Sequence, residues 1–406
     1  MREHTCLNNQ EISSKDRQIT LSSNQSDKAD TGTQPKRPLR IALVSARYYP
    51  YMGGTETHVH EVSRRMSARG HSVTILTTDV SGKLPSEESS ADVFIRRFQA
   101  YPRGIDLYFA PALYKAVRDG QWDVVHLQGY HTFVAPITMI AAKRAKVPYV
   151  VTFHSGGHSS HIRHLMRQLQ VTMLHPLLVG ASQLIGVSEF EANLFSQRLH
   201  VPRNRFTVIP NGAQLPSSVE ITPTDSGPLI LSVGRLERYK GHHRIIRAMP
   251  TIRKGFPTAR LRIAGSGPYE AELCELVQKL GLQDCVEIAS IPPAERGAMA
   301  TLMSQAALVM LFSEYEAHPV AVMEAIALKR PVLVAHTSGL AELADRGMAV
   351  SIPLESSTGQ LAAAVIQQLK DPVYSSAESD IDFPTWDVCT DKLINVYRSV
   401  SSHRSV

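Results

Sequence analysis

The chain has 406 residues, 43% of them hydrophobic and 20% charged, which is ordinary for a soluble globular protein with room for two domains. A net charge of +6 favours anionic partners such as nucleotides, sugar phosphates or an acidic membrane surface. Basic residues form no stripe with interleaved aromatics, and only 6% of residues are aromatic, so we expect no nucleic-acid partner.

The first 38 residues are polar and contain no apolar run, which predicts a disordered tail (1–38) rather than a signal peptide. No later segment reaches the roughly 18 uninterrupted apolar residues of a membrane-spanning helix. The cysteines are far apart and form no C-x-x-C pair, so neither a zinc site nor a disulfide framework is indicated. We therefore expect a protein of the cytoplasm.

Residues 39–212 alternate short β-rich runs with helical stretches. Strands are predicted at 41–44, 72–76, 93–98, 122–127, 149–153 and 183–187, with helices at 56–69 and 133–144. Apolar strands separated by helices are typical of a parallel, doubly wound sheet, so the fold class is α/β with a Rossmann-like domain.

Residues 213–228 are rich in Pro, Ser, Thr and Gly and predict an interdomain linker. A second Rossmann-like domain is expected at 229–385, with strands at 229–233, 260–264, 285–289, 307–312 and 331–335. The segment 386–402 is helical in pattern, and we expect it to pack back on the first domain. Ligands of such folds bind outside the carboxyl ends of the strands, which predicts a site in a cleft between the domains.

Two loops of the first domain carry candidate site residues. Gly53 and Gly54 follow the first strand without forming G-x-G-x-x-G, and they either let backbone approach a ligand or make an ordinary turn. His154 ends another strand, where an imidazole could hydrogen-bond a sugar hydroxyl or a carbonyl oxygen. His154, His158 and His161 lack a local Asp, Glu or Cys, so we expect no metal site.

The second domain places cations and glycines after its strands. Arg235 and Lys240 leave the carboxyl end of the strand 229–233, where they suit a diphosphate, although cations in loops also commonly face solvent. The loop 265–268, Gly-Ser-Gly-Pro, is either a nucleotide-side loop or a simple turn.

The segment 306–327 reads as strand, loop and helix, with Pro319 in the first helical turn. Free N–H groups from Val320 onward would face an anion at the positive end of the helix dipole. Glu316 and Glu324 flank this point and could accept from hydroxyls of a nucleotide sugar, or they could be solvated charges.

The stretch 161–174 interleaves basic and apolar residues at helical spacing. A helix of this kind can lie on the inner face of an anionic membrane, but more often it is a surface helix packed on one side.

Taken in order, these motifs together with Val208-Ile209-Pro210-Asn211-Gly212 resemble the retaining glycosyltransferases of family 4 over residues 39–400. The resemblance implies the GT-B fold, in which two Rossmann-like domains face each other and the second mainly holds a nucleotide-sugar donor. Many members carry Gly-Phe-Gly where this chain has Ala317-His318-Pro319, so the identity of the sugar does not follow from the resemblance.

The resemblance also assigns roles to these residues. Arg235 and Lys240 would hold the diphosphate in place of a metal, Glu324 would accept from the ribose, and Glu316 and His154 would contact the sugar. The remaining donor-binding set consists of Gly53, Gly54, Gly234, Gly265, Gly267, Val320 and Ala321. No cofactor is implied beyond the nucleotide sugar itself.

The predicted function is therefore metal-independent transfer of a sugar from a nucleotide diphosphate to a hydroxyl acceptor, with retained configuration. The acceptor would be a glycan, a glycolipid or a polysaccharide precursor, with a lipid-linked acceptor among the options. A nucleotide-sugar epimerase on the same architecture is the alternative, and a non-catalytic nucleotide-sugar-binding protein is the third hypothesis.

Overall fold

The computed structural model describes residues 37–51, 53–90, 92–103, 107–154, 161–215, 227–292, 295–375 and 383–402. The predicted tail lies outside these residues, apart from its last two, and so does most of the predicted linker. Among the helices of the described residues, none has both the length and the apolar character needed to cross a membrane.

The first domain is built on one sheet with the strand order β3-β4-β2-β1-β5-β6-β7-β8. All neighbouring strands are parallel except β3, which pairs antiparallel with β4. Its strands are β1 (Arg40–Ser45), β2 (Ser72–Asp79), β3 (Glu87–Ser90), β4 (Val93–Gln99), β5 (Val124–Gln128), β6 (Tyr149–Thr152), β7 (Gln183–Gly186) and β8 (Phe206–Val208). The accompanying helices are α1 (Gly54–Ala68), α2 (Ala112–Asp119), α3 (Val134–Arg144), α4 (His161–Val179) and α5 (Glu189–Arg198).

The second domain is a parallel sheet with the order β11-β10-β9-β12-β13-β14. Its strands are β9 (Leu229–Val233), β10 (Arg260–Ala264), β11 (Val286–Ala289), β12 (Leu308–Leu311), β13 (Val332–Ala335) and β14 (Val350–Ile352). Its helices are α6 (His242–Gly255), α7 (Glu270–Lys279), α8 (Arg296–Gln305), α9 (Val320–Ala327), α10 (Ser338–Asp345) and α11 (Thr358–Lys370). Two α/β domains with parallel sheets confirm the predicted fold class.

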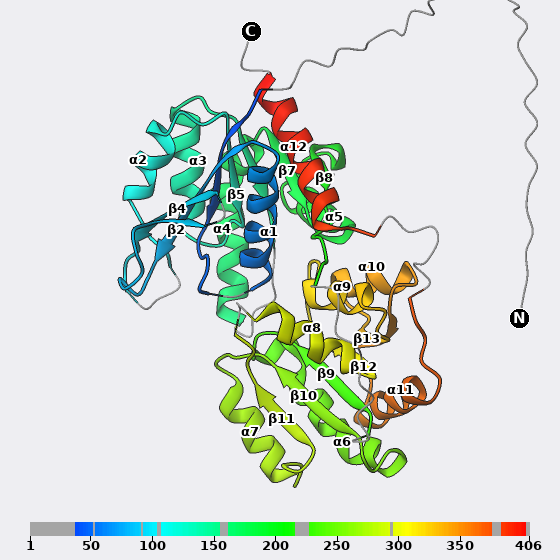
Figure 1. Cartoon of the computed structure of the whole chain (residues 1–406). Coiled ribbons are helices and arrows are strands. Elements are labelled where there is room, and N and C mark those ends of the chain that lie inside the picture. The colour runs from blue at the N-terminus through cyan, green and yellow to red at the C-terminus, as the bar shows by residue number, and fades with distance from the viewer. Residues whose placement is uncertain are drawn as a thin grey trace, which may run out of the picture. The chain divides into compact units, whose positions relative to one another are not determined.

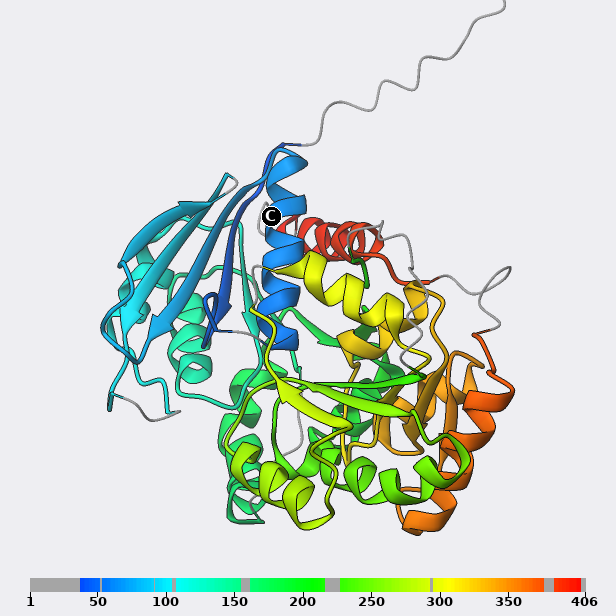
Figure 2. The same ribbon diagram turned by 60° about the horizontal axis from the view of Figure 1, so that its bottom comes forward.

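Both faces of each sheet are covered by helices, as Figures 1 and 2 show. Successive strand residues enter different cores because side chains alternate across a strand. In β1, Ile41 and Leu43 join one apolar cluster while Ala42 and Val44 join another. This double burial explains why the strands read as continuous apolar runs in the sequence.

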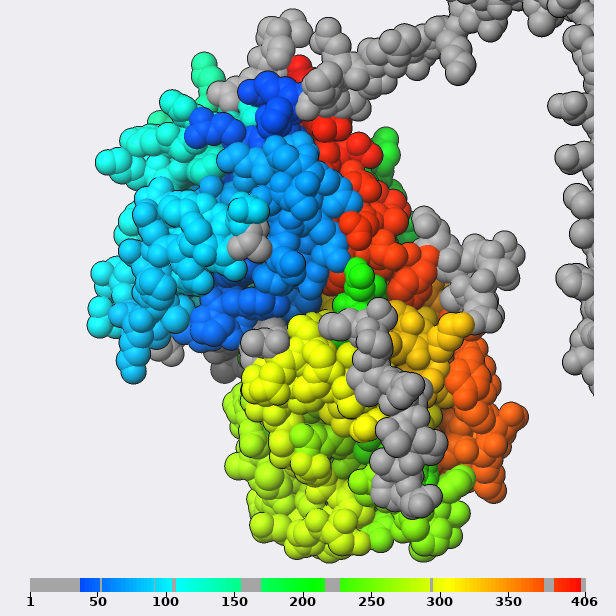
Figure 3. All heavy atoms as spheres, viewed as in Figure 1, coloured from blue at the N-terminus to red at the C-terminus, as the bar shows by residue number. Residues whose placement is uncertain are grey.

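The last helix, α12 (Trp386–Ser402), belongs to the first domain by its contacts. It packs against α1 and β5, and its buried residues Trp386, Leu393 and Tyr397 lie in the same cluster as the core of β1. The helix lies beside α1 in the space-filling view (Figure 3). The chain thus crosses between the domains twice, and the crossings touch where Ala213 N–H donates to Pro384 O at 2.9 Å.

The strand order reverses once in each domain, between β1 and β5 and between β9 and β12. Loops leaving the two strands at such a point diverge to opposite faces, which leaves a crevice at the carboxyl ends of the strands. Of the predicted residues of the second domain, Arg235 and Lys240 leave β9 and Glu316 follows β12, so the topology directs them to one crevice. Gly265 and Gly267 leave the neighbouring strand β10.

Candidate functional site

A pocket of about 400 Å³ lies at this crevice and is lined by residues of both domains. It includes every predicted site residue except Gly267. From the first domain these are Gly53, Gly54 and His154, and from the second Gly234, Arg235, Lys240, Gly265, Glu316, Val320, Ala321 and Glu324. The structure therefore brings residues that are far apart in the sequence into one pocket.

Two positions of the second domain require glycine because neighbouring backbone lies too close for a side chain. A Cβ on Gly265 would lie 1.9 Å from the carbonyl oxygen of Gly234, so the loops after β9 and β10 can pack together only without a side chain there. Gly267 does not line the pocket. A Cβ at that position would lie 2.5 Å from Leu236 O, so its place is under the β9 loop, where it supports the pocket from behind.

The loop after β9 ends in a single 3-10 turn, Arg238–Lys240, that directs Lys240 at Glu316. The Lys240 Nζ donates to Glu316 Oε1 at 2.5 Å, and both side chains are largely buried. Burial alone would lower the pKa of Lys240, but the adjacent Glu316 carboxylate outweighs it and raises the pKa. Arg235 is half-exposed and paired with Glu237 at 3.2 Å, so its guanidinium can reorient toward a ligand.

Glu316 is held in place by hydrogen bonds with two serines. Ser313 Oγ donates to Glu316 Oε1 at 2.8 Å, and Glu316 N–H donates to Ser338 Oγ at 2.8 Å. The next residues of this loop are tied to the first domain, since Asn211 Nδ2 donates to His318 O at 3.2 Å. The carboxylate is thus preorganised beside Lys240 and is not a solvated charge.

The helix α9 begins one residue later than predicted. Pro319 has φ −75° and ψ 111°, an extended conformation, and is the residue before the first helical turn. Met323 N–H donates to Pro319 O at 3.2 Å, so the N–H groups of Val320 and Ala321 precede the first bond of the helix. These two N–H groups lie at the positive end of the α9 dipole, and both residues line the pocket.

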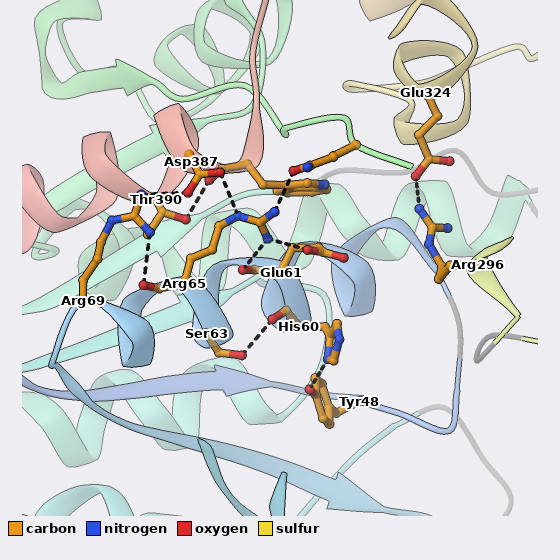
Figure 4. A network of polar contacts seen from close by, with 12 residues as sticks. Tyr48, His60, Glu61, Ser63, Arg65, Arg69, Arg296, Glu324, Asp387 and Thr390 are labelled. Atoms are coloured by element: carbon orange, nitrogen blue, oxygen red, sulfur yellow. Dashed lines mark hydrogen bonds and ion pairs between the residues drawn. The ribbon is translucent and has the colours of Figure 1, made fainter. Parts of the chain in front are cut away.

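Glu324, one helical turn further, is paired with Arg296 from the first turn of α8 (Figure 4). The side chain of Glu324 is only 4% exposed. Burial raises its pKa, and the Arg296 guanidinium acts against that rise. The sequence did not point to Arg296, which also lines the pocket.

The first domain contributes the start of α1. Gly53 precedes the helix in an extended conformation, and a Cβ on Gly54 would lie 3.9 Å from Val320 of the second domain. The starts of α1 and α9 therefore face each other closely. Arg47 Nε is 3.1 Å from Glu56 Oε1, and both residues line the pocket, although neither was predicted to.

His154 is the end of a chain of buried polar groups. Its Nε2 lies 2.7 Å from Gln128 Oε1, and Gln128 Nε2 lies 3.1 Å from His126 Nδ1. Burial lowers the pKa of both histidines well below the usual range, and the neighbouring His58 adds to the effect. With Nε2 donating to the amide, the neutral ring of His154 has Nδ1 as an acceptor.

His318 is a buried histidine with no partner for either ring nitrogen among the residues described. It lines the pocket between Glu316 and α9. Burial, assisted by Arg346, lowers its pKa to about 4, so the ring is neutral at physiological pH. A neutral imidazole offers one donor and one acceptor to a ligand.

These buried histidines make stability depend on pH. Burial lowers the pKa of His58 and of His318 to about 4 from an ordinary value of 6.5. The unfolded chain therefore binds more protons, and the stability present above about pH 6.5 is lost as the pH falls toward 4. We expect the melting temperature to be lower at about pH 5 than at about pH 7.5 by at least 2 °C or so. Calorimetry at the two pH values measures this, and an equal or higher melting temperature in acid would contradict it.

No group of three or more His, Cys, Asp or Glu side chains suited to a metal ion occurs in the described part of the chain. The positive groups that line the pocket are Arg47, Arg235, Lys240, Arg296 and the first turn of α9.

Comparison with known families matches two models in succession. Residues 52–215 match "Glycosyltransferase Family 4" and residues 218–381 match "Glycosyl transferases group 1". The two matches meet within the predicted linker and together cover most of the chain.

Curated relatives support this placement. The chain is 28% identical over 365 residues to a glycogen synthase of Mycobacterium tuberculosis, covering 82% of this chain and 87% of that protein. It is 25% identical over 417 residues to a D-inositol 3-phosphate glycosyltransferase of Nocardiopsis dassonvillei, covering 91% and 96%.

Solved structures share the fold. A sucrose-phosphate synthase of Thermosynechococcus elongatus has a TM-score of 0.72 at 19% identity, covering 90% of this chain and all of that one. The Anabaena protein HepE, solved with UDP and glucose, has a TM-score of 0.66 at 18% identity, covering 90% and 99%. The sequence matches and the two-domain fold together identify the chain as a glycosyltransferase of family 4 with the GT-B fold.

Proposed function

We propose that this glycosyltransferase transfers a sugar from a nucleotide diphosphate donor to a hydroxyl acceptor with retained anomeric configuration. The observation that supports the donor most strongly is the pocket itself. Its lining, around about 400 Å³, includes the cations Arg235 and Lys240, the N-terminus of α9 and the buried carboxylates Glu316 and Glu324. Cationic groups suit a diphosphate, and carboxylates on either side of it suit hydroxyl groups.

The diphosphate would lie against Lys240, Arg235 and the N–H groups of Val320 and Ala321. As the bond to the sugar breaks, negative charge grows on the leaving diphosphate, and fixed cations stabilise that charge. Lys240 is already held in place by Glu316 and needs no reorganisation to do this. We propose that these cations take the role that a metal ion has in other transferases.

The sugar would lie between Glu316 and His154, with Glu324 at the ribose. The acceptor hydroxyl would attack on the face of the leaving group through an oxocarbenium-like state, which retains the configuration. Pro319 has no N–H to offer the sugar. We propose that the unpartnered ring of His318 supplies a donor there, so that 317–319 shapes the preference for the sugar.

The acceptor is proposed to be a hydroxyl of a glycan, a glycolipid or a polysaccharide precursor. Named relatives differ in this respect, since one is a glycogen synthase and another a D-inositol 3-phosphate glycosyltransferase. Neither is an epimerase, and the nucleotide assay described below distinguishes epimerisation from transfer.

A peripheral membrane contact is supported by exposed apolar side chains around α4. Leu169 and Met173 are 62% and 70% exposed and lie one turn apart on one face of the helix. Gln170 contacts the loop that carries exposed Phe133, whose ring packs on that of Phe109. In a chain of net charge +6, this patch favours an anionic bilayer at the cytoplasmic face of a membrane as its partner.

Liposome flotation tests the membrane contact. Vesicles with anionic lipid should float the protein at low salt, and the double substitution Leu169→Glu and Met173→Glu should reduce the floated fraction at least about fivefold. The pair Val373→Glu and Tyr374→Glu adds the same charge at exposed positions of the second domain and should leave flotation unchanged. Absence of wild-type flotation at low salt, or equal loss in both pairs, would overturn the membrane contact.

A thermal-shift screen with UDP, ADP, GDP and their hexose derivatives tests the donor. A nucleotide at 100 times its dissociation constant adds about 2.7 kcal/mol to the stability of the folded protein. We expect one base to raise the melting temperature. If none of these compounds shifts it, the proposed donor is wrong. With the donor found, release of nucleotide diphosphate that requires an acceptor indicates transfer, and conversion of the donor without an acceptor indicates an epimerase.

A further inference from the structure

Arg296 stands between two cavities. It lines the pocket described above and also a neighbouring cavity of about 850 Å³ that is bounded by α1, β4 and the loop after β1. Its side chain is 25% exposed and reaches across to the buried carboxylate of Glu324, as Figure 4 shows. The pairing joins the first turn of α8 to α9, two helices that the sequence gives no reason to couple.

The contact uses one of the two carboxylate oxygens. Arg296 Nη2 donates to Glu324 Oε1, and Glu324 Oε2 has no hydrogen-bond partner among the described residues. An arginine on one oxygen fixes the plane of the carboxylate and leaves the second oxygen to accept from a ligand.

The surroundings of Glu324 disfavour a charged carboxylate, so the nearby cation Arg296 affects its ionisation. Neighbouring side chains of α9 such as Met323 and Ala325 are buried in an apolar cluster with β12 and β13. The charged groups that face the carboxylate are Arg296 on α8 and Glu61 on α1. Burial raises the pKa of Glu324, Glu61 raises it further, and Arg296 opposes both. Without Arg296, this carboxyl group would be protonated more readily.

We propose that Arg296 is a positioning residue for the donor, which holds Glu324 ionised and oriented so that its free oxygen accepts hydrogen bonds from the ribose hydroxyls. The inference rests on the proposed function, because it requires a nucleotide in the pocket. Arg296 acts through Glu324 and need not touch the ligand itself.

Calorimetric titration with UDP, ADP and GDP tests the inference on the wild type and on Arg296→Ala, Arg296→Lys, Glu324→Gln and the Ala/Gln double variant. We expect Arg296→Ala to weaken binding of the preferred nucleotide at least about tenfold at about pH 6, and less at about pH 8, relative to the wild type at the same pH. The titration of the nucleotide phosphates affects both proteins alike, so it cancels in the ratio of the two dissociation constants at each pH. Arg296→Lys should recover most of the affinity, because it keeps a cation at the same place.

The double-mutant cycle separates an indirect effect from a direct one. If Arg296 acts through Glu324, the double variant binds no more weakly than Glu324→Gln alone. A 2′,3′-dideoxy nucleotide should bind wild type and Arg296→Ala equally, since it has no ribose hydroxyls to offer. In turnover, Arg296→Ala should raise the donor KM and leave kcat nearly unchanged.

Arg64 provides the matched control. It is an exposed arginine that lines the neighbouring cavity and has no hydrogen bond or ion pair with the residues described, so Arg64→Ala should bind like the wild type. Additive losses in the cycle, or a loss that is the same at both pH values, would overturn the role of Arg296 while leaving the donor site intact. Failure of the wild type to bind any of the three nucleotides would overturn the proposed function and this inference together.

Discussion

Replacing Lys240 with alanine is expected to lower kcat/KM for sugar transfer by about 100-fold, or about 2.7 kcal/mol of transition-state stabilisation. Lys240 is held in the pocket by an ion pair, with its Nζ 2.5 Å from Glu316 Oε1. The substitution removes a fixed charge where the diphosphate leaves and also frees the Glu316 carboxylate to move.

The control for this variant is Arg238→Ala. Arg238 lies on the same 3-10 turn and is exposed, but it does not line the pocket. Initial rates with the preferred donor, together with melting curves, separate lost chemistry from lost folding. A folded Lys240→Ala enzyme with wild-type turnover would show that this lysine has no part in catalysis.

Replacing Trp386 with alanine is expected to lower the free energy of unfolding by about 3–5 kcal/mol, the largest stability effect that we predict for a single side chain. Trp386 is fully buried in the cluster that joins α12 to the first domain. It also abuts the first crossing between the domains, because a Cβ on Gly212 would lie 2.3 Å from Trp386 N. The cavity that the substitution leaves would loosen the docking of α12 on the first domain.

Tyr374→Ala is the control for Trp386. Tyr374 is an aromatic residue that follows α11, but it is 56% exposed, so its removal should cost less than about 0.5 kcal/mol. Urea unfolding followed by circular dichroism measures both variants. A change below about 1 kcal/mol in Trp386→Ala would mean that α12 is not anchored by this side chain.

The parts of the fold that the sequence predicts are those whose side chains carry a periodic apolar signal. Strands such as β1 and β12 are buried on both faces and contain unbroken apolar runs. The strand β3 was not predicted, because it carries no apolar signal. Its residues, Glu-Glu-Ser-Ser, are all exposed, and its pairing depends on Arg96 and Arg97 of β4 meeting Glu87 and Glu88.

The candidate site was predicted to the extent that its residues follow strands. Lys240, Glu316 and His154 all leave carboxyl ends of strands, and the topology brings these ends together. Arg47 and Arg296 also follow strands, β1 and β11, but the sequence does not show the carboxylate with which each of them pairs. Neither carries a local signal, because the partner of each depends on how distant elements pack.

Gly267 and Pro319 show the limits of reading motifs alone. A glycine in a loop is equally required for contact with a ligand and for contact with neighbouring backbone, and only the structure places Gly267 against Leu236. Pro319 suits both the first helical position and the residue before it, since φ is near −65° in either case. The observed ψ of 111° decides for the latter.

The central claim, transfer from a nucleotide sugar with retention, is tested most directly by proton NMR of the reaction. The purified enzyme is mixed with the donor selected by thermal shift and with a panel of soluble acceptors, and the anomeric signals of donor and product are followed. We predict a product with the same anomeric configuration as the donor, formed in step with release of the nucleotide diphosphate. A product of inverted configuration, or an epimerised donor with no diphosphate released, would contradict the account.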